Sequence, residues 1–221
     1  MSNDTKLGLQ VHEHLVSIGL ETPSDFTQAT NGDAAHKREV IEKNFIEIMT
    51  VLGLDITNDS MVDTPKRIAK MYVDEVFCGL DYKNFPKIMS FENSFQNAGL
   101  VVERNIKVNS ACSHHFVPTI GVATIGYIPN KRVIGLSKLQ RVTNFFSRRP
   151  QEQERFGMQL LEVMKYLLDT EDVAVIVKAK HYCVAWRGVQ DPESEFITSH
   201  ISGSFRESPE LRSEFFQIAM Q

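Results

Sequence analysis

Apolar residues recur at helical intervals in the first part of the chain. The spacing predicts one helix over 5–18 and a second over 34–52, separated by a polar loop over 21–32. The first helix carries Leu7, Val11, Leu15 and Ile18, with Gly19 at its end. The stripe of the second consists of Val40, Ile41, Phe45, Ile48, Met49 and Leu52. A third helix is predicted with Thr64 as its cap, Pro65 in its first turn and Gly79 at its close.

After Pro86 the periodicity changes from helix to strand. Residues 100–109 and 116–128 are rich in Val, Ile and Thr, which predicts two strands. Two amphipathic helices follow, one from near Ser137 and one from Pro150 to about Leu168.

The last third of the chain returns to strands. Alternation of Val173, Val175 and Val177 predicts a long strand that reaches Val184, and a weaker strand is predicted over 196–205. Ser208 as a cap and Pro209 in the first turn predict a final helix.

The order from residue 100 onward is therefore strand, strand, helix, helix, strand, strand. Paired long strands around a helix pair are typical of an antiparallel sheet with helices on one face, an α+β fold. We divide the chain into an N-terminal helical region, 1–95, and a catalytic domain, 96–221, that ends in the final helix.

Composition narrows the class of protein. Of 221 residues, 42% are apolar and 24% charged, which is ordinary globular usage. The net charge of −4 argues against a nucleic-acid-coating protein, because such binding requires a basic surface. We expect no secretory signal at the N-terminus and no apolar stretch of the ~20 residues that span a bilayer. Three scattered cysteines do not suggest a disulfide framework, and a cytoplasmic protein is expected.

Two short segments combine cysteine with histidine. Cys112 and His115 have two residues between them, a spacing that can hold one metal ion, and His181 and Cys183 follow about seventy residues later. Both lie near the end of the predicted long strand, so alternation places His181 and Cys183 on the same face as Val173, Val175 and Val177. Chance pairs of buried cysteine and histidine are common, so either pair alone carries little weight. Cys78, near a helix end, is assigned to packing.

Taken together, the two pairs predict a catalytic metal site. Cys112, His115 and Cys183 would suit Zn²⁺ and, being three rather than four, would leave a position for water. His114 and His181 are then candidates for proton transfer.

Cationic residues outside this group include Arg67, Lys138, Arg141 and Arg187. Lys138 and Arg141 share a helix face near Ser137, where N–H groups attract anions, so a phosphate site is one interpretation. A solvated basic face is the other. Glu152 and Glu154 open the next helix, where carboxylates are favoured by the helix dipole alone.

Five segments together resemble one known family. They are TPKRIAKMY (64–72), CSHHFVP (112–118), IGLSKLQR (134–141), RPQEQERF (149–156) and HYCVAWRGV (181–189). In sequence and spacing they resemble GTP cyclohydrolase I from about residue 40 to the end. The resemblance implies the tunnelling fold, whose ββααββ order agrees with the periodicity. It also implies a toroidal homodecamer with active sites between subunits.

The resemblance implies a reaction as well. Water activated by Zn²⁺ attacks C8 of GTP, formate leaves, and rearrangement of the ribose gives 7,8-dihydroneopterin triphosphate, the first step of pterin and tetrahydrofolate biosynthesis. By position, Cys112, His115 and Cys183 would be the zinc ligands, and His114 and His181 the acid–base pair. Glu154 and Gln153 would bind guanine. The residues implied for the triphosphate and ribose are Arg67, Ser137, Lys138, Arg141 and Arg187.

Three segments depart from the family pattern. Ser113 stands where the family usually has Glu, and Ala185-Trp186 and the segment from Phe196 to His200 also differ. Loss of a carboxylate beside a metal ligand can alter metal affinity or proton transfer. Two alternatives follow: a related hydrolase with a different purine nucleotide or a ring-opened product, and a non-catalytic zinc- or nucleotide-binding module.

Overall fold

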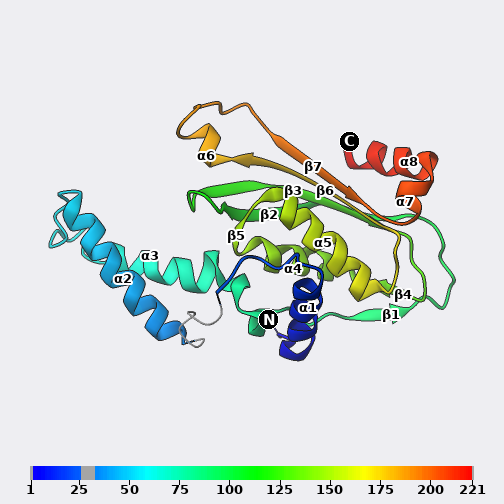
Figure 1. Ribbon diagram of the computed structural model, residues 1–221, viewed down its shortest axis with the longest axis horizontal. Coiled ribbons are helices and arrows are strands. Elements are labelled where there is room, and N and C mark those ends of the chain that lie inside the picture. The colour runs from blue at the N-terminus through cyan, green and yellow to red at the C-terminus, as the bar shows by residue number, and fades with distance from the viewer. Residues whose placement is uncertain (1, 26–32, 221) are drawn as a thin grey trace.

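A five-stranded sheet organises the molecule (Figure 1). The computed structural model describes residues 2–25 and 33–220. The strands of the sheet lie in the order β5-β2-β3-β6-β7. They are β2 (Val101–Cys112), β3 (Pro118–Tyr127), β5 (Pro150–Gln151), β6 (Val173–His181) and β7 (Phe196–Ile201). All neighbours are antiparallel except β5, which runs parallel to β2. A separate two-stranded sheet pairs β1 (Ser90–Glu92) with β4 (Arg132–Ile134).

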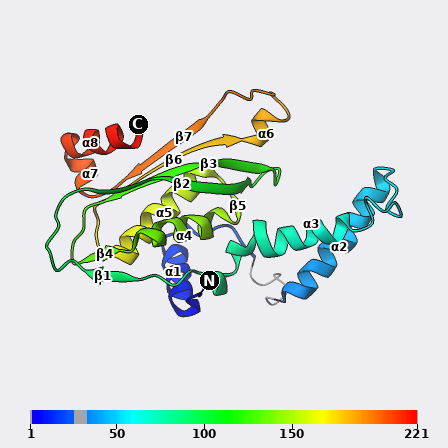
Figure 2. The same cartoon turned by 180° about the vertical axis from the view of Figure 1, so that it is seen from behind.

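Helices α4 (Leu136–Ser147) and α5 (Gln153–Leu168) cover one face of this sheet. Their apolar stripes pack with valines of β6 and with Val11 and Leu15 of α1 (Thr5–Ser17) in one cluster of buried side chains. The other face is covered at one end by α7 (Ser204–Glu207) and α8 (Pro209–Met220), where Phe205 and Phe215 pack on Ala174 and Ile176 (Figure 2). The predicted ββααββ order and α+β class are confirmed.

An arm of two helices extends from this body (Figures 1 and 2). It is formed by α2 (Ala34–Val51) and α3 (Thr64–Lys70), and α3 continues as a π-helical segment, Met71–Val76. Short 3₁₀ turns at Cys78–Leu80 and Tyr82–Asn84 return the chain to the body. Only Met49 of the α2 stripe is buried, and Ile48 and Leu52 are 47% and 69% exposed.

Several predicted boundaries need correction. Asp63 precedes α3 and Thr64 is its first residue, and regular α-helix ends at Lys70, well before Gly79. The helix predicted from Pro150 begins at Gln153, because Pro150 and Gln151 pair with the end of β2. The weaker strand ends at Ile201 instead of residue 205. Ser208 does cap the last helix, since its hydroxyl accepts from the amide of Leu211 at 3.1 Å. Of the loop predicted over 21–32, residues 26–32 lie outside the described residues.

A buried arginine joins the N-terminal segment to the body. Arg149 is fully buried and lies over the rings of Tyr82, Phe145 and Phe146, with 4.7 Å to the nearest centroid. Its guanidinium pairs with Glu21 at 3.0 Å and also donates to the carbonyl of Gly79. The segment after α1 is thereby tied to the residue that precedes β5. The predicted domain boundary at residue 95/96 stays a prediction.

Candidate active site

Three potential metal ligands converge at one end of the sheet. Cys112 is the last residue of β2, His115 lies in the turn that follows, and Cys183 lies in the short helix α6 (Tyr182–Ala185). Their ligand atoms all lie within 4.8 Å of one another. The turn is closed by hydrogen bonds between Cys112 and two backbone groups, the amide of Phe116 and the carbonyl of Val117, both at 2.9 Å. This closure brings Cys112 and His115 to the same side.

The donor set fits a single metal ion. In a tetrahedral zinc site with Zn–S near 2.3 Å, ligand atoms are separated by about 3.7 Å. The Sγ of Cys112 and the Nδ1 of His115 are 4.0 Å apart, so a small contraction would complete the geometry. Burial raises the pKa of the Cys183 thiol, as does its contact with Cys112. A bound cation reverses that effect, because it stabilises the thiolate.

Cys183 reaches this position by a route that differs from the prediction. The strand expected to reach Val184 ends at His181, so strand alternation does not place Cys183. The reason is the length of the neighbouring strands. His181 pairs with Thr119 near the start of β3, and β7 pairs with β6 only as far as Ala179. Beyond His181 the backbone has no partner strand among these elements, and it turns into a helix that carries Cys183 toward Cys112.

His181 is held on both sides of its ring. Its Nε2 lies 2.9 Å from Oε1 of Gln153, and its Nδ1 lies 3.4 Å from the Thr119 hydroxyl. The ring meets Phe196 edge-on at 5.7 Å between centroids. Burial lowers the pKa of His181, and the charge of Glu154 partly offsets this. A neutral imidazole able to exchange protons near neutral pH is what acid–base catalysis requires.

A cavity of about 340 Å³ opens beside these groups. The predicted site residues that line it are Cys112, His114, Gln153, Glu154, His181 and Cys183. Arg187 is close by, since its Nη1 lies 2.9 Å from Nε2 of His115. The structure thus brings together the predicted metal ligands, the two predicted acid–base histidines and Glu154, the carboxylate predicted to bind guanine. The amide of Gln153 already donates to two backbone carbonyls.

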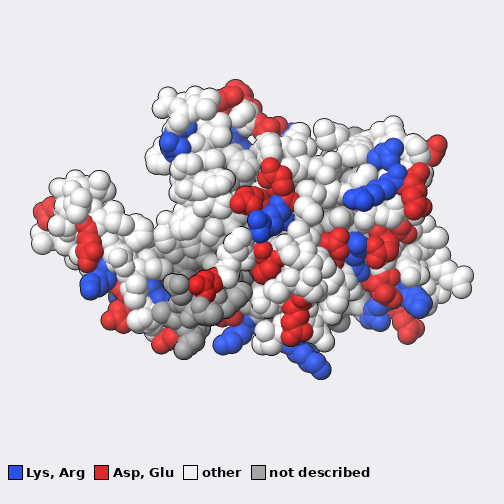
Figure 3. Space-filling model, in the orientation of Figure 1, with Lys and Arg blue, Asp and Glu red and all other residues white. Residues whose placement is uncertain are grey.

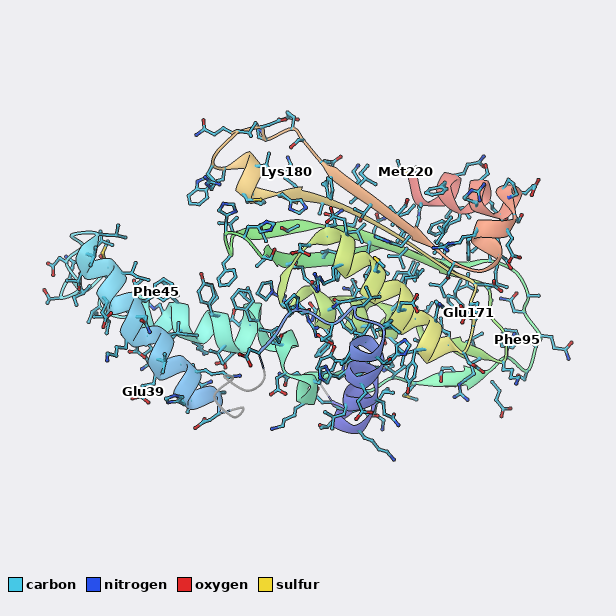
Figure 4. All side chains as sticks on the ribbon, in the orientation of Figure 1. Glu39, Phe45, Phe95, Glu171, Lys180 and Met220 are labelled. Carbon is cyan, nitrogen blue, oxygen red and sulfur yellow. The ribbon has the colours of Figure 1, made fainter. Side chains whose placement is uncertain are left out.

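Four predicted residues do not join this cavity. Ser137, Lys138 and Arg141 lie in the first turns of α4, directly after β4, and their neighbour Gln140 bonds Lys107 in the middle of β2, away from the Cys112 end. Lys180 and Glu171, labelled in Figure 4, lie toward the two ends of β6, and the Cys/His group lies at the Lys180 end. At ~3.3 Å per residue, the stretch of β2 from Lys107 to Cys112 spans about 17 Å. Arg67 lies on the arm and pairs with Asp63 at 3.2 Å. One chain therefore does not assemble the whole predicted constellation.

The sequence analysis did not identify two residues near the Cys/His group, Thr119 and Gln151. Thr119 faces His181 only because of the β3–β6 register, and Gln151 sits beside Cys112 only because β5 pairs with β2. Neither belongs to a residue type or spacing that signals chemistry by itself. A reliable strand register was the missing information.

The face shown in Figure 3 has basic and acidic side chains interspersed, with no continuous basic stripe. Across the described residues, no helix has the length and apolar character needed to cross a membrane.

An α+β fold with a possible Cys/His/Cys metal group beside a half-buried histidine and a cavity indicates the class of metal-dependent enzymes. Comparison with known proteins identifies the family. A model of the GTP cyclohydrolase I family matches residues 41–220. GTP cyclohydrolase 1 of Tolumonas auensis is 45% identical over 219 residues, which cover 99% of this chain and all of the relative. The same enzyme of Vibrio cholerae is 46% identical over 97% of this chain and 96% of its own length. The chain belongs to the GTP cyclohydrolase I family, which confirms the resemblance found in the sequence.

Proposed function

We propose that the chain carries out the GTP cyclohydrolase I reaction, conversion of GTP and water to formate and 7,8-dihydroneopterin triphosphate, in the cavity at the Cys/His/Cys group. The observation that carries this proposal is the convergence of Cys112, His115 and Cys183 beside His181. The retained family motifs and the identity over nearly the full chain support it. The product is a precursor for pterin and folate synthesis, and a cytoplasmic location follows from the nucleotide substrate.

The resident metal is proposed to be Zn²⁺. Two thiolates and one imidazole form the soft donor set that zinc prefers, and three protein ligands leave a coordination position open. When bound there, the ion supplies a Lewis acid that lowers the pKa of water toward neutrality.

The chain's own residues supply the rest of the chemistry. Glu154, exposed at the mouth of the cavity, accepts hydrogen bonds from N1–H and the 2-amino group of guanine, two donors that adenine does not present together. His114 and His181 hold and move protons at the purine ring as it opens. Arg187, the cation nearest the ligand group, is placed to bind the polar end of the substrate.

The remaining cations point to a shared site. Ser137, Lys138 and Arg141 do not line the cavity of their own chain. We propose that a second copy of the chain presents these residues, with Arg67, to the triphosphate. The exposed stripe of α2 supports assembly into a homo-oligomer, for which a toroidal decamer is the proposal.

The test is incubation of the zinc-loaded protein with GTP while formate and dihydroneopterin triphosphate are measured together. Equal amounts of both products are expected. Formate without the pterin would indicate arrest after ring opening. Absence of both from a protein that binds zinc and nucleotide would reject the proposal and favour a binding module or another purine substrate.

A further inference from the structure

The amide of Gln153 has an orientation that the backbone dictates. Its Nε2 lies 3.0 Å from the carbonyl oxygen of Val177 and 3.0 Å from that of Phe196. Both carbonyls can only accept, so the amide nitrogen must face them and Oε1 must face His181. The Nε2 of His181, 2.9 Å from that oxygen, is therefore the donor.

This orientation fixes the tautomer of the neutral His181 ring. With its proton on Nε2, the ring has an acceptor at Nδ1. Thr119 is directly opposite His181 in the β3–β6 pairing, and its hydroxyl, 3.4 Å from Nδ1, is placed to donate to it. Both ring nitrogens are thus engaged by groups of defined polarity.

A small cavity of about 10 Å³ lies beside the same ring. That volume is at the lower limit for one water molecule. Most of its surface is apolar, and the polar residues around it are Ser110, Thr119, Gln151, Gln153 and His181.

Gln151, one of the residues around this cavity, carries a buried acceptor without a partner in the part of the chain that the structure describes. Its Nε2 donates to the carbonyl of Phe146 at 3.0 Å and to Oε1 of Gln159 at 2.9 Å. The amide of Gln159 is oriented in turn by its bond to the carbonyl of Leu20 at 2.7 Å. Gln151 is only 6% exposed, and its Oε1 is buried with no hydrogen-bond partner among the described residues. Buried oxygens of this kind are regularly satisfied by an ordered water.

We propose that one ordered water fills this cavity and donates to Oε1 of Gln151 and to Oγ1 of Thr119, whose hydroxyl donates to Nδ1 of His181. Thr119, Gln151 and Gln153 are then positioning residues that hold the ring and keep its proton on Nε2 before substrate binds. An effect of these residues on the rate of formate release rests on the proposed function. The presence of the water and the tautomer of His181 do not rest on it.

Neutron diffraction from crystals of the metal-loaded full chain, grown near pH 8, tests the arrangement without any turnover. Deuterium on Nε2 of His181 but not on Nδ1, and a water between Gln151 and Thr119, are expected. Deuterium on Nδ1, or an empty cavity, would overturn the proposal. Failure of the proposed function would show separately, as absence of formate from the wild-type protein.

Thr119→Val and Thr119→Ser provide a matched pair of variants. Valine removes the hydroxyl at similar volume, and we expect kcat for formate release to fall about tenfold, with KM for GTP within about twofold, because a misoriented acid–base group loses part of its effect. Serine keeps the hydroxyl and should restore kcat to within about twofold. Metal content is measured in both variants, since a purely structural defect would lower it. An unchanged kcat in Thr119→Val at full metal content would show that Thr119 does not position His181.

Discussion

The body and the arm of this molecule both contain helices with an apolar stripe, but the stripes differ in how far they are buried. In the body, Leu160 of α5 and Val142 of α4 are fully buried against the sheet. In the arm, Val51 of α2 is 87% exposed and Met49 is the buried member of its stripe. A hydrophobic period predicts which face of a helix is apolar, whereas only the neighbouring elements decide whether that face is covered. The body covers its own apolar faces, whereas much of the apolar surface of α2 is left exposed within one chain, and the proposed oligomer would cover it.

The largest effect is expected at the metal group, which the comparison assigns wholly to the body. Cys183→Ala removes one of three ligands, so we expect loss of stoichiometric zinc and a fall in kcat of at least about a thousandfold. Metal analysis and formate release measure the two effects. Cys78→Ala is the matched control, because Cys78 lies outside the ligand group, and it should keep both. Full activity of Cys183→Ala without zinc would refute the ligand assignment.

A charged residue introduced on α2 should disrupt oligomer assembly without affecting metal binding. Ile48→Glu places a carboxylate on the exposed stripe, and burial of that charge between copies would be costly. We expect the variant to dissociate toward a 25.1 kDa monomer in size-exclusion chromatography with light scattering, with activity lost and zinc retained.

The control on the same helix is Glu47→Gln, at an exposed polar position, which should leave the assembly intact. A wild-type protein that is monomeric and active would contradict this prediction, because the apolar stripe of α2 would then be exposed to solvent in the active enzyme.

Truncation of an apolar side chain should lower the free energy of unfolding more in the body than in the arm. Leu160→Ala leaves a cavity in the closed core of the body and should lower the free energy of unfolding by ~3 kcal/mol. Val51→Ala, at the exposed end of the arm, should change it by less than about 0.5 kcal/mol. Both are measured by urea denaturation. A loss at Val51 as large as that at Leu160 would mean that the arm already has a tight apolar contact in the state measured.

The smallest effect concerns the pH dependence of the body. His200 of β7 packs against Gly157 of α5, where a Cβ would lie 2.4 Å from its ring. Burial lowers its pKa, and the charge of Glu154 partly opposes this. Because the unfolded chain binds the proton more tightly, His200 destabilises the protein progressively as pH falls below about 6.5. Thermal unfolding of His200→Asn should show a weaker loss of stability on acidification than the wild type. An identical slope would mean that His200 is not buried as described.

Much of this fold could be predicted because its signals are local. Valine alternation in β6, the Ser208 cap and the helix pair between strand pairs depend on neighbours in sequence, and so does the Cys112–His115 spacing. The end of β6 at His181 could not be predicted, since it is set by where β3 and β7 stop pairing. The contact of Thr119 with His181 depends on the same register.

The site itself was only partly predictable for a second physical reason. Motif spacing predicts which residues carry chemistry, but it does not say which of them one chain can bring together. Lys138 and Glu154 belong to helices that are adjacent in sequence, yet only Glu154 lines the cavity beside the Cys/His group.

The ion pair of Arg149 with Glu21 has a consequence for the protein as it is synthesised. The two residues are 128 positions apart, so at ~5–20 residues per second the ribosome makes Glu21 roughly 6–26 s before Arg149. During that interval Glu21 has no ionic partner, and Val11 and Leu15 of α1 lack the side chains of α4 and α5 that share their buried cluster. Docking of α1 is therefore incomplete until the second half of the chain has been made, and part of its apolar side is uncovered until then.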